Sequence, residues 1–314
     1  MTITQLEYVL AVAQYQNFTS ASEKCHVTQP TLSMQIQKLE EELGALIFDR
    51  SKKPIQITKI GEQIVKQAQT IVNESERMQD IVAQEKGFIG GEFRLGIIPT
   101  VSPTLLPLFL KNFIKKYSKV DLKIEEQHTQ QALTNIENGS LDAAILATPL
   151  ENANFIEKPL FYEPFVAYIP ENHWLCKSNK INSEDLQIDE ILMLEDGHCF
   201  KNTVLNLCGQ KQATQKRGFQ IKSGSFETLI RLSNEGLGMT LLPYLHSLEL
   251  SEKQLQHIRH FNEPQPAREI SLVYHKNELK AQMINALHEV ISGVIRGAIA
   301  FHDVKIISPV VKPK

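Results

Sequence analysis

Residues 26–44 of the chain read HVTQPTLSMQIQKLEEELG, and this stretch decides the fold of the N-terminal part. Thr28 is a residue type that caps helices, and Pro30 fits the first helical turn, where its missing N–H has no partner to lose. Glycine at position 44 is a typical stop signal, so we expect a helix that ends at Leu43. At about 100° per residue, four apolar side chains share one face of this helix and must pack on a core: Leu32, Ile36, Leu39 and Leu43.

Two shorter helices are expected before this one. Thr4 with Glu7, and Ser20 with Glu23, have the spacing of capping boxes. The second helix ends near Cys25, and residues 26–28 form a three-residue turn into the helix described above. Two helices joined in this way form the helix-turn-helix pattern. The alternating apolar residues at 55 and 57 then predict a short hairpin wing.

The polar face of the expected helix has the composition of a DNA-reading surface. No acidic residue occurs between positions 25 and 39, and none between 50 and 59. Small polar and amide side chains can reach base edges in a major groove, while cations of the wing suit phosphates. The same pattern also fits a solvated basic loop beside a three-helix cluster. The candidate DNA-binding residues are Gln29, Pro30, Thr31, Ser33, Met34, Gln37, Lys38, Arg50, Lys52 and Lys53.

A long helix is expected over residues 59–87. It contains no proline, and positions 64, 68, 71, 75, 78 and 82 repeat at alternating four- and three-residue steps, almost all of them apolar. This is the seam of a coiled coil of nearly three heptads, which favours a dimerising helix over a buried one. Gly90 and Gly91 then indicate a hinge over 88–91.

Composition limits the function classes. The 314 residues suggest about two domains, and 15 Gly and 14 Pro exclude collagenous and low-complexity chains. The net charge of −3 requires that DNA binding be local. No run of about 18 apolar residues and no leader pattern is seen, so we expect a cytoplasmic protein without membrane contact. Four cysteines are too few for a disulfide scaffold, so any pairing should be transient.

After residue 92 the pattern changes to alternating strands and helices, which predicts a parallel sheet covered by helices. We expect the tail, 303–314, to be loose. The expected strands are 93–98, 120–126, 141–147, 165–169, 191–194, 238–242 and 270–274, and the expected helices are 102–117, 130–138, 226–235 and 279–301.

Cys199 and Cys208 bracket a helix-forming segment that ends at Gly209. A cysteine near a helix N-terminus is favoured as the thiolate. In one continuous helix the two Cα atoms would be ~13.5 Å apart on opposite faces. A disulfide needs them within ~7 Å, so pairing would require local refolding. The alternative is that both are small buried apolar residues, which is what we expect of Cys25 and Cys176.

Much of the chain resembles the LysR-type transcriptional regulators. The N-terminal resemblance rests on Thr28-Gln29-Pro30-Thr31-Leu32-Ser33 and Phe48-Asp49-Arg50, and the later one on residues 139–145 and 235–243. It implies an α/β fold with a winged helix-turn-helix at 1–58, a dimerising linker helix at 59–87 and a regulatory domain at 92–302. That domain resembles periplasmic solute-binding proteins, with one lobe at 92–163 plus 268–302 and a second at 164–267.

One branch of that family, the peroxide sensors, is similar in further detail. The matching residues are Gly197-His198-Cys199 with Cys208, Pro99-Thr100, His128-Thr129 and the segment around Arg268, whereas residues 200–207 depart from the pattern. The resemblance implies that Cys199 is the peroxidatic thiol and Cys208 the resolving thiol. It also implies that four residues hold peroxide: Thr100, Thr129, His198 and Arg268.

The expected function is therefore a regulator, and not an enzyme, that senses hydrogen peroxide by reversible disulfide formation and changes its promoter contacts. The expected partners are double-stranded promoter DNA, peroxide, a second copy of the chain in a dimer or tetramer, RNA polymerase, and a reductant such as a glutaredoxin or thioredoxin. No cofactor or metal is expected. A regulator that binds a small metabolite between its lobes, with silent cysteines, is one alternative. A thiol peroxidase is the other, although a peroxidase does not need a DNA-reading module.

Overall fold

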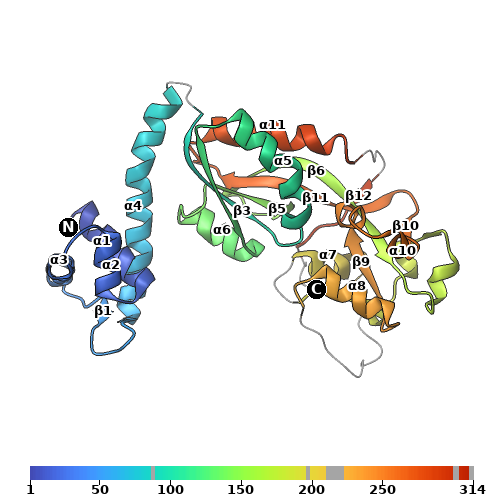
Figure 1. Ribbon diagram of the computed structural model, residues 1–314, viewed down its shortest axis with the longest axis horizontal. Helices are drawn as coiled ribbons and strands as arrows, with labels where there is room; N and C mark the ends of the chain where they lie inside the picture. The colour runs from blue at the N-terminus through green and yellow to red at the C-terminus, as the bar shows by residue number, and fades with distance from the viewer. Residues whose placement is uncertain (86–88, 196–198, 210–222, 300–303, 311–314) are drawn as a thin grey trace. The chain divides into compact units, whose positions relative to one another are not determined.

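The computed structural model describes residues 1–85, 89–195, 199–209, 223–299 and 304–310 (Figure 1). The chain forms two compact units, one of residues 1–88 with 137–140 and one of the remaining residues. Among the described residues, no helix has the length and apolar character needed to cross a membrane.

The first unit is a winged helix-turn-helix followed by a long helix. β1 and β2 pair antiparallel and form the wing. The predicted order of elements is confirmed. The elements are α1 (Ile3–Tyr15), α2 (Phe18–Lys24), α3 (Gln29–Leu43), β1 (Phe48–Asp49), β2 (Gln56–Ile57) and α4 (Lys59–Glu85).

The caps of the first two helices differ from the prediction. Thr2 and Gln5 form the capping box of α1, so this helix begins before Thr4. Asn17 caps α2, where its side-chain oxygen accepts from two backbone N–H groups. Asparagine was overlooked because the prediction required a hydroxyl three residues before an acid, although asparagine caps helices equally well.

α3 follows the prediction at both ends. The Thr28 side chain accepts from the Thr31 N–H, and Gly44 ends the helix with φ 65°. Leu32, Ile36 and Leu39 are fully buried. Leu43 was expected in the same core but is 42% exposed, because it is the last residue of α3 and lies beyond the part of the helix that packs on the core.

Part of the predicted coiled-coil seam of α4 is buried against the rest of its own unit. Ala68 is 1% exposed and packs with α1 and α3 residues, and Ile64 and Ile71 cover the same core. Met78 is 69% exposed. The N-terminal half of α4 therefore packs on the core of the winged helix-turn-helix, whereas Ile60 in its first turn and Met78 further along are exposed.

The second unit is built on one extended, mixed sheet. The strand order is β4-β3-β5-β11-β6-β10-β7, with β12 beside β11 and with β9 beside β6 and β8. Its elements are β3 (Gly91–Ile97), α5 (Ser102–Lys116), β4 (Val120–Glu126), α6 (Thr129–Glu137), β5 (Ala143–Thr148), β6 (Phe155–Tyr168), β7 (Lys180–Ile181), β8 (Ile191–Leu192), α7 (Cys199–Leu207), α8 (Phe226–Asn234), β9 (Met239–Pro243), α9 (Tyr244–Ser247), α10 (Glu252–Leu255), β10 (Ile258–Phe261), β11 (Gln265–His275), α11 (Ala281–Ile295) and β12 (Val304–Ile306).

Two hydrophobic cores lie along this sheet. The first core contains residues 93–161 and 270–295, together with Cys199 and Leu245. The second core contains buried residues from 165–194, 200–208 and 226–242, together with Phe261 and Ile307. The long strand β6 passes from one core to the other, and β11 pairs antiparallel with it. In Figure 1, α5 and α11 lie together on one side of the β3, β5 and β11 strands, and α6 lies on the other.

Four predictions for this unit need correction. The sheet was expected to be parallel, but it is mixed, because β11 pairs antiparallel with both β5 and β6. β6 starts at Phe155, ten residues before the expected strand. Polar residues in its first half interrupt the apolar pattern from which the strand was predicted. The last helix ends at Ile295. The tail expected to be loose forms β12, which pairs with β11 and is followed by the buried residues Ile307 and Pro309.

Candidate functional site

The two cysteines of interest lie at opposite ends of α7. Cys199 is its first residue, and the Cys208 N–H donates to the Val204 carbonyl at 3.0 Å, which continues the helix past Leu207. Both cysteines are buried as thiols, but Cys199 packs in the first core and Cys208 in the second. The predicted helix is confirmed, and its Gly209 stop has φ 67°. With this helix intact, the sulfurs cannot meet.

The thiol of Cys199 lies where β5 and α6 meet α7. The Thr129 side chain at the start of α6, the backbone N–H of Ala147 in β5 and the N–H of Phe200 are close enough to stabilise a thiolate. Thr129 Oγ1 is buried and, within the described part of the chain, makes no hydrogen bond of good geometry. Its hydroxyl is therefore available to a small ligand beside the sulfur.

Burial dominates the chemistry of the resting thiol. It raises the pKa of Cys199, against the opposing effects of the Arg268 charge, the Thr129 side chain and two backbone N–H groups. Burial therefore opposes the thiolate that we expected at the helix N-terminus. The reason is that the helix end is inside the protein, where removing water costs the anion more than the N–H groups return.

Arg268 holds the neighbouring network together. Its guanidinium donates to Thr100 Oγ1 at 2.9 Å, to the Thr100 carbonyl at 3.0 Å and to Glu163 Oε2 at 2.9 and 2.7 Å. The guanidinium also lies over the Phe200 ring, 5.4 Å from its centre. Arg268 and Glu163 are each 1% exposed. The network thus joins the turn after β3, the strands β6 and β11, and the residue next to Cys199.

The fixed Thr100 side chain can still act as a donor. Its oxygen accepts from Arg268, so its own proton remains free to point elsewhere. The N-cap of α5 is Val101, so Thr100 does not cap this helix.

The structure brings together Thr100, Thr129, Cys199 and Arg268 from four separate segments. His198 lies outside the described residues. Sequence reasoning missed two contributors. Glu163 could have been found as an acid beside the apolar second half of β6, whereas the Ala147 N–H belongs to the backbone and leaves no sequence signal.

The proposed DNA-reading side chains lie on one exposed surface of the first unit. Gln29, Pro30, Thr31, Met34, Gln37 and Lys38 are exposed, and Ser33 is half-buried. Lys52 and Lys53 are exposed on the turn between β1 and β2.

Arg50 has a structural role in addition to its position in the wing. Its guanidinium donates to Ser33 Oγ at 3.1 Å and to Glu40 Oε2 at 2.8 Å. Glu40 is 4% exposed, and its other oxygen accepts from the N–H groups of Ile47 and Phe48. This ion pair therefore fixes the wing against α3, a contact that the sequence did not reveal.

The remaining cysteines are less buried than expected. Cys25 and Cys176 are both partly exposed. The Cys176 thiol donates to the Glu171 carbonyl at 3.0 Å.

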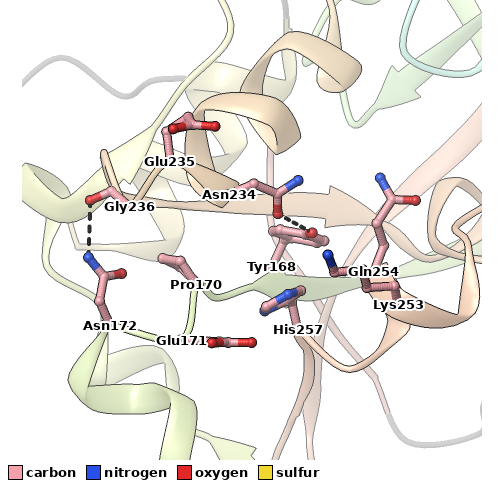
Figure 2. Close-up of a pocket in the computed structure, with 10 residues that line it drawn as sticks. All are labelled: Tyr168, Pro170, Glu171, Asn172, Asn234, Glu235, Gly236, Lys253, Gln254 and His257. Atoms are coloured by element: carbon pink, nitrogen blue, oxygen red, sulfur yellow. Dashed lines mark hydrogen bonds between the residues drawn. The ribbon is translucent and has the colours of Figure 1, made fainter.

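A polar pocket of about 560 Å³ is lined by residues between Tyr168 and His257, and Cys199 is not among them (Figure 2). Its wall includes Tyr168, whose hydroxyl donates to Asn234 at 2.6 Å. The wall also carries Glu171, Glu235 and Lys253. All lining residues come from 168–257, so this pocket is not the metabolite site expected between the lobes.

Two family models match the chain. Residues 3–62 match the bacterial regulatory helix-turn-helix protein of the lysR family, and residues 86–295 match the LysR substrate binding domain. The hydrogen peroxide-inducible genes activator of Pectobacterium carotovorum is 36% identical over 87% of this chain and 90% of its own length. The DNA-binding transcriptional dual regulator OxyR of Escherichia coli K12 is 34% identical over 87% of this chain and 89% of its own length.

Solved structures agree with these relatives. Full-length OxyR of Pseudomonas aeruginosa, in a mutant form, matches 93% of this chain and 98% of its own, with a TM-score of 0.74 and 32% identity. An H2O2-bound mutant of Corynebacterium glutamicum OxyR matches 95% of this chain and 93% of its own, with a TM-score of 0.62 and 26% identity. The chain belongs to the LysR family of bacterial helix-turn-helix regulators.

Proposed function

We propose that this chain is a transcription regulator that senses hydrogen peroxide through Cys199 and Cys208 and reports the result as altered contacts with promoter DNA. The observation that carries the proposal is the placement of the Cys199 thiol, which is buried beside the Thr129 side chain, the Ala147 N–H and the Arg268 network. The OxyR relatives support the same assignment.

The first chemical step is oxidation of Cys199. The thiol gives up its proton, the sulfur attacks one peroxide oxygen, and the O–O bond breaks. The departing hydroxide takes up the proton that the thiol gave up and leaves as water, and Cys199 becomes a sulfenic acid. Thr100 and Thr129 can donate hydrogen bonds to the peroxide oxygens, and the Arg268 charge stabilises the negative charge that develops.

The second step joins the cysteines. The Cys208 thiolate attacks the Cys199 sulfur and displaces hydroxide, which leaves as a second water. Two thiols are oxidised and one peroxide is reduced to two waters. α7 must unwind first, which removes Phe200, Val204 and Leu207 from the second core at about 1.5–3 kcal/mol each. Oxidation therefore replaces one packed arrangement with another, as a two-state switch requires.

The DNA-reading part acts through α3 and the wing. We assign base contacts to the exposed face of α3 and phosphate contacts to Lys52 and Lys53. The exposed portion of α4, around Met78, is the surface for a second copy of the chain. We propose the boundaries 1–58 for the DNA-binding domain, 59–87 for the linker helix and 92–302 for the regulatory domain, within a homotetramer.

The chain is proposed to be a sensor and not an enzyme. Each disulfide must be reduced by a separate thiol reductant, such as a glutaredoxin or thioredoxin, before the protein can respond again. RNA polymerase is the partner that reads the changed promoter complex.

Two variants test the assignment of the thiols. Cys199→Ser should abolish peroxide consumption, whereas Cys208→Ser should still consume about one equivalent and stop at sulfenic acid or a mixed disulfide. Stopped-flow measurement with limiting peroxide separates them. If Cys208→Ser reacts no faster than Cys199→Ser, the roles are misassigned. Rapid and repeated turnover of peroxide by the parent when a thiol reductant is supplied in excess would instead indicate a peroxidase.

A further inference from the structure

The described C-terminal segment, residues 304–310, contacts the helix that carries both cysteines. Asn206 lies in the last turn of α7, and its side-chain amide donates to two carbonyl oxygens of the tail. The distances are 2.8 Å to Ser308 and 2.9 Å to Val310. One side chain thus satisfies two backbone acceptors of a segment about 100 residues further along the chain.

The same segment is anchored beside Arg268. β12 pairs in parallel with β11 at residues 265–267, and the Ile307 N–H donates to the Ala267 carbonyl at 2.8 Å. Ile307 is 8% exposed and belongs to the second core, with Phe200, Val204 and Cys208 of α7. The tail therefore binds α7 through both hydrogen bonds and apolar packing.

We propose that residues 304–310 are a latch that holds α7 in its helical, dithiol form and is released when the disulfide closes. The proposal rests on the Cys199–Cys208 chemistry described above and adds the element that sets how readily it proceeds. Helix α7 must unwind to bring two sulfurs from opposite ends together. Asn206, two residues before Cys208, cannot keep its place during that change.

If residues 304–310 are a latch, loss of their contact with α7 changes the rate of disulfide closure but not the rate of sulfenic acid formation. Oxidation of Cys199 to sulfenic acid occurs before α7 unwinds, so its rate should not depend on the tail. Closure of the disulfide should become faster when the tail contact is lost. Two net hydrogen bonds correspond to roughly a tenfold to thirtyfold change in the helical population. The disulfide should become correspondingly harder to reduce, because the dithiol form has lost its support.

The sharpest variant is Asn206→Leu, which removes both donors while keeping a side chain of similar size. Leucine favours helix more than asparagine does, so propensity alone would slow closure. Asn202→Leu is the matched control, since it makes the same change one turn earlier on α7, where no tail contact is seen among the described residues. A chain that ends at Ile307 is a second test, because it keeps β12 and removes Ser308 and Val310.

Both rates are measured in full-length protein with a small excess of peroxide, by sulfenic acid trapping and by non-reducing mass spectrometry. Faster closure in Asn206→Leu and in the shortened chain, but not in Asn202→Leu, with unchanged sulfenic acid formation, supports the latch. Closure at the parent rate in both tail variants would overturn it. Equal acceleration of both steps would also overturn it, because the tail would then control access to Cys199.

Hydrogen exchange provides a readout that does not depend on any variant. The 304–310 amides should be protected in the reduced parent and should lose that protection once it is oxidised. Unchanged protection alongside a formed disulfide would contradict the latch while leaving the redox chemistry in place. If the parent forms no disulfide, the proposed function itself fails, and the latch with it.

Discussion

Glu163→Gln is the most informative single substitution in the buried network. The carboxylate accepts two hydrogen bonds from Arg268 through Oε2 and one from the Leu245 N–H through Oε1 at 3.0 Å. Glutamine keeps the shape but removes the charge and turns an acceptor into a donor. Arg268, 1% exposed, is then left as a buried cation without a counter-ion.

The expected loss of stability is large. Breaking a buried ion pair by removing one partner destabilises proteins by about 3–5 kcal/mol. The free energy of unfolding should fall by that amount in urea titrations of the reduced protein. Combining Glu163→Gln with Arg268→Met removes both charges and should recover much of the loss, because a neutral pair needs no mutual compensation.

A second readout separates positioning from packing. Without Glu163, the uncompensated Arg268 charge should lower the pKa of Cys199 and speed alkylation of its thiol by iodoacetamide. Peroxide oxidation should nevertheless slow down, because Arg268 no longer fixes Thr100. A fall in the free energy of unfolding of less than about 1 kcal/mol would refute the role given to the Glu163–Arg268 pair. Changes in the same direction in the alkylation rate and the peroxide oxidation rate would also refute it.

Other predictions concern both ends of the chain. Lys52→Ala with Lys53→Ala should weaken binding to all DNA sequences and reduce the slope of log K against log salt by about 2; an unchanged slope would remove the wing from the phosphate contacts. Thr100→Val should slow peroxide oxidation of Cys199 by about ten- to a thousandfold. Thr104→Val is the control and should leave that rate unchanged, because the buried Thr104 hydroxyl donates to the Val101 carbonyl of its own helix. The alkylation rate of Cys199 should keep rising with pH above about 8.5, where that of an ordinary thiol levels off, because burial raises the pKa of Cys199. The reduced protein should lose stability over the same rise in pH, since the thiol ionises at lower pH in the unfolded chain than in the folded one. A plateau near pH 8.5 would contradict this environment.

Local sequence signals predicted much of the fold correctly. The turn before α3, the Gly44 stop and the alternation of strands and helices after residue 92 depend on short-range rules, and the structure follows them. Helix α7 and its Gly209 end were also predictable, because helix formers and a left-handed glycine act locally.

Long-range pairings were not predictable in the same way. The tail showed no strand pattern of its own, because β12 is only three residues long and depends on β11 for its hydrogen bonds. The pKa of Cys199 was expected to be lowered by a helix N-terminus, but the packing of two cores around that end reverses its direction. The Glu163–Arg268 and Glu40–Arg50 pairs join residues far apart in sequence, and only the folded chain shows them.

The most direct test of the central claim is non-reducing peptide mapping of the full-length protein before and after a small excess of hydrogen peroxide. We expect one new species, in which the peptides that contain Cys199 and Cys208 are joined, and we expect a thiol reductant to reverse it. Oxidised protein in which Cys208 remains a free thiol, or in which Cys25 or Cys176 forms the bridge, would contradict the account.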